Sequence, residues 1–181
     1  MKVRKVLTRL DRLATMAIVQ MMTMLLVPAR HRFLLKSYQR WGMRMKEWPN
    51  YISARTDIDG TDLSQIYLGE GVTISSYVRL LTHDWSPHTV GKAMGISTQK
   101  PLGKIAGISI GDFSFVGTGS IIMPGAQIGR GCIIGSGTVV RGIIPDFSIV
   151  IGSPGQIIGD SRDYMKRLAV REGWDVPELR G

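Results

Sequence analysis

Three histidines and one cysteine are the side chains of this 181-residue chain best suited to act as a base, a nucleophile or a metal ligand near neutral pH. His83 is followed by Asp84 and Trp85, and His88 lies five residues after His83. An imidazole pKa suits a general base at neutral pH, so His83 is the principal candidate for a base and His88 a candidate helper. His31 lies in a basic N-terminal segment, where we expect it at the surface.

The two residues that follow His83 each have two interpretations. Asp84 could orient the base, or it could cap a turn. Trp85 could wall a substrate pocket, or it could pack a loop onto the rest of the fold. The choice depends on the elements that position these side chains.

The first 48 residues differ in charge from the rest of the chain. They contain 11 Lys and Arg against Asp11 and Glu47, a balance of +9, which equals the formal net charge of the whole chain. Residues 49–181 contain 12 basic and 12 acidic residues and balance to zero. All of the excess charge therefore belongs to an N-terminal arm, which we place at residues 1–50.

Apolar residues of the arm recur at intervals of three and four from Val3 to Leu25, which predicts an amphipathic helix that ends at Pro28. A second basic segment, from Arg30 to Lys46, contains interleaved aromatic and aliphatic residues. The resulting helix pair could pack on its own protein or on a sister subunit. It could also attach to an anionic membrane surface. No nucleic-acid reading module accompanies the basic residues, so we expect no nucleic-acid partner.

The uncharged stretch from Leu13 to Ala29 is 17 residues long and includes Thr15, Gln20 and Thr23, so it is short and polar for a membrane-spanning helix. No small-x-small cleavage motif marks it as an export signal. We therefore expect a cytoplasmic protein, with peripheral contact at the inner face of the membrane through residues 1–48 as an open alternative.

The rest of the chain is a repeat with a period of six residues. One register holds only aliphatic residues: Leu68, Ile74, Leu80, Ile110, Val116, Ile122, Ile128, Ile134 and Val140. Small residues stand two positions before the later members, at Ser114, Ser120, Ala126, Cys132 and Thr138, and glycine follows at Gly111, Gly117, Gly129 and Gly135. The segment between Leu80 and Ile110 breaks the pattern, which predicts an inserted loop over residues 83–107.

A period of six fits neither a helix nor a hairpin, but it fits a solenoid in which three short strands close one triangular coil. The aliphatic residue of each hexad fills the interior, and the small residue fits the crowded corner. Cys132 occupies such a corner position, so we expect it to be buried and structural rather than a covalent nucleophile.

The repeat resembles the hexapeptide-repeat acyltransferases. The likeness covers about residues 56–158 and is carried by Ile110–Gly117, Ile121–Gly129, Ile134–Val140 and the closing segments Ile144-Pro145-Asp146 and Gly152-Ser153-Pro154-Gly155. The resemblance implies a left-handed parallel β-helix, an exception to the usual right-handed crossover, and a homotrimer. We assign this domain to residues 51–159.

Among these enzymes, the segment Leu80–Ser86 is most similar to O-acetyltransferases that modify polysaccharides and sugars. The resemblance implies that His83 is the general base and that acetyl-CoA is the co-substrate. Transfer would be direct, to a hydroxyl of a sugar or glycan that could be lipid-linked. No metal is expected.

The resemblance also implies that the donor lies in a groove between subunits. The positions matching its contacts are Gly117, Thr118, Gly135, Ser136 and Pro154. The family often has Thr-Lys-Asp before its Ile/Val-Pro pair, whereas this chain has Arg141-Gly142-Ile143, so Arg141 is the candidate for the phosphate contact. Gln156 stands where the family often has Lys.

Two other functions fit the same fold. A zinc carbonic anhydrase would use three histidines, and the spacing of His83 and His88 suits two of its ligands, but the third would have to be His31. A non-catalytic scaffold would need neither a loop histidine nor donor-site turns.

Beyond the repeat, residues 160–181 are expected to form a short helix and a tail. Asp160 or Ser161 can cap a helix from Arg162 to Arg171, which Gly173 ends. We expect Tyr164, Met165 and Leu168 to face inward and the helix to pack over the last coil.

Overall fold

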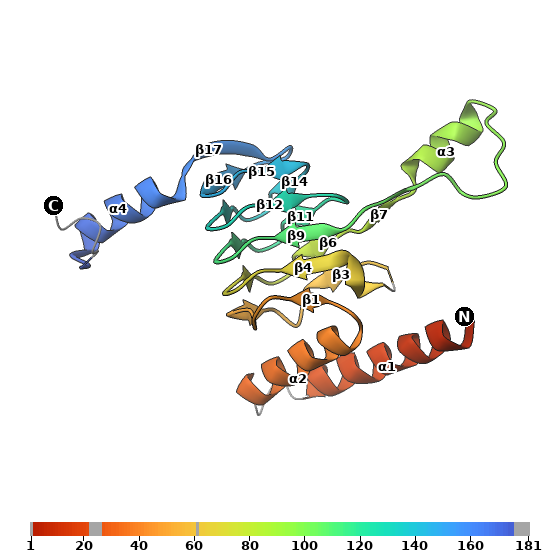
Figure 1. Cartoon of the computed structure of the whole chain (residues 1–181), viewed down its shortest axis with the longest axis horizontal. Coiled ribbons are helices and arrows are strands. Elements are labelled where there is room, and N and C mark those ends of the chain that lie inside the picture. The colour runs from red at the N-terminus through yellow and green to blue at the C-terminus, as the bar shows by residue number, and fades with distance from the viewer. Residues whose placement is uncertain (1, 22–26, 61, 176–181) are drawn as a thin grey trace.

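The computed structural model describes residues 2–21, 27–60 and 62–175, and side chains from residues 10–21, 30–60 and 62–175. Short strands form three parallel sheets, which are the three faces of a prism (Figure 1). The first sheet contains β1 (Arg44–Met45), β4 (Ile66–Leu68), β9 (Ile108–Ile110), β12 (Gln127–Ile128) and β15 (Ile143–Ile144). The second contains β2 (Tyr51–Ile52), β5 (Thr73–Ile74), β10 (Phe115–Val116), β13 (Ile133–Ile134) and β16 (Ser148–Ile151), and β17 (Gln156–Asp160) joins it antiparallel to β16. The third contains β3 (Asp57–Ile58), β6 (Arg79–Leu80), β11 (Ile121–Ile122) and β14 (Val139–Val140).

The period of six places one aliphatic residue of each strand inside the prism, as predicted. Ile74 pairs in register with Val116, and Val116 with Ile134, while Leu80 pairs with Ile122 and Ile122 with Val140. Every aliphatic residue of the predicted register is at most 3% exposed. Each coil of three strands thus buries its apolar edge on its neighbours, and the core is built by stacking.

The corners of the prism require small residues because successive coils approach closely there. The predicted corner residues Ser114, Ser120, Ala126, Cys132 and Thr138 are all at most 1% exposed. The hydroxyl groups of Ser114 and Ser120 donate to the carbonyl oxygens of Gly129 and Gly135 in the next coil, at 2.7 and 2.8 Å. At Gly117, an added Cβ would lie 2.6 Å from the amide nitrogen of Ser136, so the close approach of the next coil excludes a side chain.

Two helices cap the N-terminal end of the prism: α1 (Lys2–Met21) and α2 (Val27–Arg40). Pro28 falls in the first turn of α2, a position that tolerates proline. Leu34, Leu35 and Tyr38 of α2 are buried and join the core of the solenoid. The solenoid begins before residue 51, because β1 pairs with β4 and belongs to the first coil.

The interruption of the repeat is an insertion that leaves the prism between the second and third coils. It comprises β7 (His83–Asp84), the helix α3 (Ser86–Ala93) and β8 (Lys104–Ile105), which pairs antiparallel with β7. The insertion extends outward from the prism (Figure 1). It occupies the segment in which the hexad pattern is interrupted.

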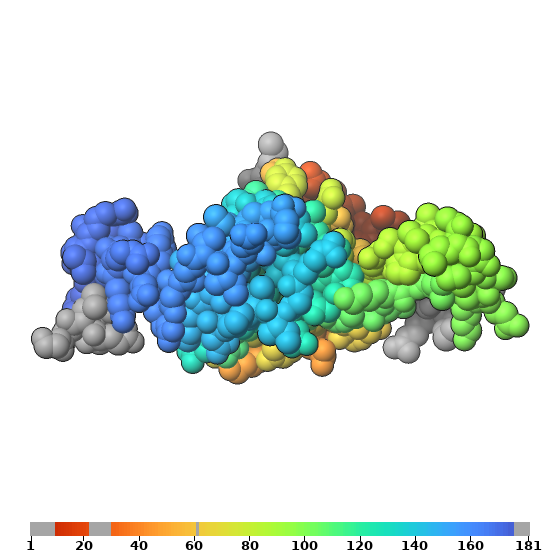
Figure 2. Space-filling model, turned by 90° about the horizontal axis from the view of Figure 1, so that it is seen from above, coloured from red at the N-terminus to blue at the C-terminus, as the bar shows by residue number. Residues whose placement is uncertain are grey.

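The C-terminal helix α4 (Ser161–Glu172) has the predicted ends but not the predicted packing. The carboxylate of Asp160 accepts the amide of Arg162, and Gly173 ends the helix in the left-handed conformation with φ 66°. However, Tyr164 and Met165 are 43% and 45% exposed, although we expected them to face inward. Strand β17 carries the chain past the prism edge, so α4 projects on the side opposite the insertion (Figure 2).

Candidate functional site

His83 lies where the insertion leaves the prism, and it is paired with a carboxylate that its sequence neighbours did not reveal. Its Nδ1 lies 3.0 Å from Oδ2 of Asp59, and the His83 side chain is 32% exposed. Asp59 follows β3 in the first coil, and β3 pairs with β6, the strand that precedes His83. The stacking of two coils therefore brings Asp59 beneath His83.

Asp59 is held firmly by the residue before His83. Its Oδ1 accepts the backbone amide of Thr82 at 2.6 Å and the Thr82 hydroxyl at 2.9 Å. Both carboxylate oxygens thus have partners on the strand end that carries His83. When Nδ1–H donates to Asp59, the imidazole is fixed in orientation and Nε2 is left as the atom that can accept a proton.

Asp84 acts as a turn cap in this structure. Its carboxylate accepts the amide of Ser86 at 2.9 Å, at the start of α3. This hydrogen bond holds the Asp84 pKa below its usual value, and the nearby positive charge of Arg141 contributes a smaller part in the same direction. Of the two roles considered for Asp84, this hydrogen bond supports the turn cap, and Asp59 is the carboxylate that contacts the His83 imidazole.

Trp85 packs the two ends of the insertion together. A Cβ on Gly103 would lie 2.4 Å from the Trp85 ring, so the ring rests directly on the glycine backbone. The Trp85 ring centroid is 5.8 Å from that of His83, and the residue is 44% exposed. Trp85 therefore packs the insertion together, as one of its two considered roles requires. It is also exposed beside His83, where it could wall a substrate pocket.

The other two histidines are engaged elsewhere. His88 accepts the amide of Leu102 on Nδ1 at 3.3 Å, which ties α3 to the returning chain. His31 is half-buried rather than a surface residue: its Nε2 accepts the amide of Ile52 at 3.1 Å, and its ring stacks on Tyr51. Burial, with the charge of Arg30, lowers the His31 pKa.

The three histidines are thus held by three different parts of the fold. Within residues 2–21, 27–60 and 62–175, no group of three or more His, Cys, Asp or Glu could hold a metal ion. The His31 ligand that a carbonic anhydrase would need points its Nε2 at the backbone of β2.

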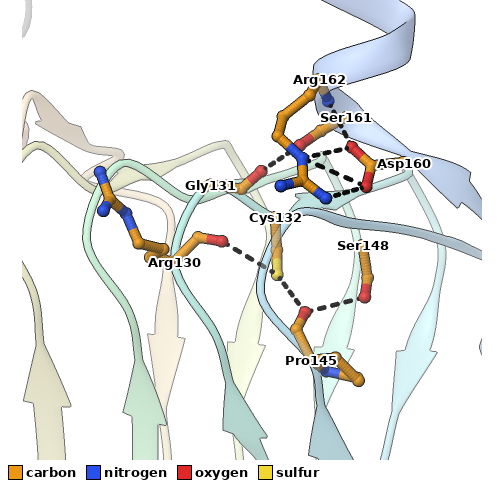
Figure 3. Close-up of polar contacts among 8 residues, drawn as sticks. All are labelled: Arg130, Gly131, Cys132, Pro145, Ser148, Asp160, Ser161 and Arg162. Atoms are coloured by element: carbon orange, nitrogen blue, oxygen red, sulfur yellow. Dashed lines mark hydrogen bonds and ion pairs between the residues drawn. The ribbon is translucent and has the colours of Figure 1, made fainter.

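Cys132 is a buried corner residue. Its thiol lies 3.1 Å from the carbonyl oxygen of Pro145 and 3.6 Å from that of Arg130 (Figure 3). Burial raises the Cys132 pKa. A buried thiol with a raised pKa is a poor nucleophile, as its position in the repeat predicts.

The turns assigned to the donor stack on one another at the corner between the second and third sheets. Gly117 and Thr118 precede β11, and Gly135 and Ser136 precede β14 one coil further on. The carbonyl oxygen of Thr118 accepts the amide of Gly137 at 2.9 Å. Among the described residues, the amides of Thr118 and Ser136 have no acceptor, so both can donate to a ligand.

The third sheet joins these turns to the candidate base. His83 and Arg141 follow β6 and β14, whereas the two turns precede β11 and β14. Because all strands of this sheet are parallel, the base and Arg141 lie at one edge and the turns at the other. The amide of Gly155 donates to the carbonyl oxygen of Val139 at 2.8 Å, which places neighbouring Pro154 beside β14.

Asp59 is the residue that the sequence interpretation missed. A signal was present, because Ile52 and Ile58 are six residues apart and continue the hexad pattern upstream. Aligning Ile58 with Leu80 would have placed Asp59 one coil below the start of the insertion.

A three-sided parallel β-solenoid built from hexads defines the class of hexapeptide-repeat proteins. Residues 107–142 match the family described as bacterial transferase hexapeptide (six repeats). Solved structures give the handedness: the fold is the left-handed β-helix of hexapeptide-repeat acetyltransferases. The predicted resemblance is therefore confirmed.

Particular relatives are similar over parts of the chain. The probable acetyltransferase Rv3034c of Mycobacterium tuberculosis is 43% identical over 51 residues, which are 28% of this chain and 17% of the relative. A galactoside O-acetyltransferase of Lactococcus lactis is 30% identical over 102 residues, 55% of this chain and 44% of the relative. The chain spans 17% to 53% of the lengths of the first three curated relatives it matches.

Two solved structures share the fold over most of the chain. A galactoside acetyltransferase in complex with coenzyme A superposes with a TM-score of 0.64 at 20% identity, covering 90% of this chain and 84% of that one. The hexapeptide-repeat acetyltransferase VCA0836 of Vibrio cholerae gives a TM-score of 0.59 at 14% identity, covering 87% and 93%.

Proposed function

We propose that the protein is an acetyl-CoA-dependent O-acetyltransferase that transfers an acetyl group to a hydroxyl of a sugar or glycan. The observation that carries this proposal is the Asp59–His83 pair, with His83 partly exposed at the mouth of an insertion in a β-helix. A scaffold would not need a partly buried carboxylate paired with a histidine in this way.

The residues present fit the donor. Thr118 and Ser136 are exposed, and their free amides can donate to its amide carbonyl groups. Arg141 is the candidate cation for the phosphates of acetyl-CoA. Pro154 lies beside β14, the last strand of the third sheet. When bound, acetyl-CoA supplies an acetyl group activated as a thioester.

In this mechanism Asp59 holds the imidazole and His83 moves the proton. Nε2 takes the proton of the acceptor hydroxyl as the oxygen bonds to the acetyl carbon. The carbon–sulfur bond breaks, and His83 returns the proton to the departing sulfur. Cys132 takes no part, so transfer is direct and has no acyl-enzyme.

The sugar acceptor is supported by relatives with sugar-modifying names. One is the galactoside O-acetyltransferase of Lactococcus lactis, and another is named for an O-acetyl transferase of lipopolysaccharide biosynthesis in Escherichia coli, 37% identical over 51 residues. We extend this class to a polysaccharide or a lipid-linked glycan as the acceptor of this chain.

The assembly we propose is a homotrimer with the donor between subunits. Its support is the apolar surface that one chain leaves open. Phe113 and Phe115 are 53% and 42% exposed and line a groove of about 730 Å³ between α4 and the second sheet. A neighbouring subunit would cover this surface and the exposed side of α4.

We also propose a cytoplasmic protein with peripheral contact at the inner face of the membrane through residues 1–48. None of the helices described here is long and apolar enough to cross a membrane.

The test is a screen of acceptors with acetyl-CoA, which records thiol release and the mass of the acceptor. We expect thiol release that depends on a sugar or glycan and a mass increase of one acetyl group. Metal analysis of the same preparation is the control. Bound zinc with hydration of carbon dioxide would favour the anhydrase, and no reaction across soluble and lipid-linked acceptors would favour a scaffold.

A further inference from the structure

Helix α1 presents its apolar side away from the protein. Over residues 10–21 the outward positions recur at the three- and four-residue spacing of one helix face, and all are exposed: Leu10, Leu13, Ala14, Ala17, Ile18 and Met21. The four large side chains among them are 44% to 79% exposed. An amphipathic helix of a globular protein normally turns such a face inward.

Polar contacts on the opposite face hold α1 in this orientation. The Asp11 carboxylate accepts from Arg40 at 2.8 Å and from Nε1 of Trp41 at 2.7 Å. Arg12 donates to the carbonyl oxygens of Gly60 at 2.7 Å and Ile58 at 3.4 Å. Turning the apolar face inward would break these contacts, so its exposure is built into the fold.

The arm that carries this face is strongly positive in sequence. Residues 1–48 carry a balance of +9, and Arg32 and Lys36 of neighbouring α2 are exposed. An apolar helix face flanked by Lys and Arg suits the boundary between headgroups and acyl chains of an anionic bilayer. Two such arms would repel each other, which disfavours contact between the arms of two copies.

We propose that the outward face of α1, defined as Leu10, Leu13, Ala14, Ala17, Ile18 and Met21, docks parallel to the surface of an anionic phospholipid bilayer. This inference rests on the proposed membrane contact of residues 1–48 and names its surface and orientation. The helix caps the N-terminal end of the prism, so the bilayer lies beneath the first coil (Figure 1).

This orientation brings the candidate site near the bilayer. His83 comes directly after the last strand of the second coil, and its imidazole lies 3.0 Å from the carboxylate of Asp59 in the first coil. Adjacent strands of a sheet are about 4.8 Å apart, so the site lies on the order of 10 Å from the capped end of the solenoid. An acceptor glycan anchored in the same membrane would reach His83 without leaving the surface.

The experiment is vesicle co-sedimentation of the full chain without acetyl-CoA or acceptor. The vesicles contain phosphatidylcholine alone or with about 30% phosphatidylglycerol. We expect binding to the anionic vesicles, weakened at least about tenfold when salt rises from low to near-molar concentration. The double variant Leu13→Asp/Ile18→Asp should bind at least about tenfold more weakly. Both positions are exposed, so the fold should survive, as circular dichroism can check.

The matched control is Ile143→Asp/Ile157→Asp, which makes the same charge change at two exposed apolar residues away from the N-terminal arm, the insertion and α4, 75% and 52% exposed. It should bind as the unmodified chain does. Equal binding to neutral vesicles, unimpaired binding by Leu13→Asp/Ile18→Asp, or a loss of oligomer mass in that variant would overturn the proposal. The last result would make the face a subunit contact.

Thiol release by the unmodified chain with soluble sugars, measured without vesicles, separates the two proposals. Acetyl transfer without vesicle binding would refute the docking face and the proposed membrane contact, and would leave the transferase function standing. Vesicle binding without acetyl transfer to any acceptor would refute only the enzymatic function.

Discussion

At the scale of single residues, the candidate site depends on a pair whose members are 24 positions apart in the chain. The nearest carboxylate in sequence, Asp84, caps a turn, while Asp59 accepts from both Thr82 and His83. Position along the chain is a poor guide to partners in a solenoid, because each residue lies above one that is a full coil earlier.

Replacing His83 with alanine should lower turnover by about 10²- to 10⁴-fold, the usual contribution of a general base. Donor binding and the fold should remain, because His83 is partly exposed and Asp59 keeps its two hydrogen bonds to Thr82. Steady-state thiol release with the best acceptor, together with calorimetric titration of coenzyme A, measures both. Turnover close to that of the unmodified chain would remove His83 from the mechanism.

Asp59→Asn should reduce turnover by about 10- to 100-fold, the effect of losing a partner that orients an active imidazole. The amide can still meet Thr82 but no longer carries the charge that stabilises protonated His83. The informative measurement is kcat set against KM, because loss of the partner that orients the imidazole should lower kcat and leave the KM for acetyl-CoA nearly unchanged. Asp84→Asn is the matched control and should have a smaller effect, and equal losses in the two variants would contradict the assignment.

At the scale of elements, the period of six was enough to predict the solenoid, its interior residues and the insertion. Each hexad specifies one strand and one corner through residue size alone, so local sequence determines the repeat. The upstream end was harder to place, since β1 (Arg44–Met45) lies in a segment whose charge marks it as part of the arm.

Periodicity could not predict which face of α1 turns toward the protein or where α4 packs. A hydrophobic pattern tells which residues share a helix face, but not which face turns inward. In α1, Asp11 and Arg12 decide the orientation through partners at least 29 residues away. In α4, β17 carries the helix beyond the prism, where the chain offers little surface to cover it.

Gly117→Ala tests the stacking of coils at the donor corner. The new Cβ would meet the Ser136 amide nitrogen at 2.6 Å, and the backbone there cannot move without displacing the next coil. We expect the free energy of unfolding to fall by about 1–3 kcal/mol, as for overpacking in a close-packed interior. Denaturant titration measures it.

The control for this substitution is Gly159→Ala in β17, where the nearest atom to a new Cβ is 4.0 Å away. Its unfolding free energy should change by less than about 0.5 kcal/mol. Similar losses in both variants would show that general effects of alanine, rather than contact between coils, determine the result.

At the scale of the whole molecule, a single chain has a buried core but leaves many large apolar side chains exposed. The insertion and α4 project on opposite sides (Figure 2), and both carry exposed apolar residues, among them Val90 at 58% and Val170 at 74%. Projections of this kind are expected where a fold is completed by copies of itself.

Light scattering should therefore give about three times the 20.0 kDa mass of the chain at micromolar concentration. Removal of residues 161–181 should lower that mass, because it removes one of the two projections while leaving every coil intact. A 20.0 kDa species for the full chain would refute the trimer and the placement of the donor between subunits.

The contacts of Arg12 link the N-terminal arm to the chemistry. Its guanidinium holds the carbonyl groups of Ile58 and Gly60, the residues on either side of Asp59. The arm is thus a clamp on the segment that supports the candidate base, in addition to its proposed contact with the membrane. A shortened chain that starts after α2 would keep His83, Asp59 and all the donor turns, yet it would lose this clamp. Any force that pulls α1 from the prism acts one peptide unit from the carboxylate that sets the imidazole in place.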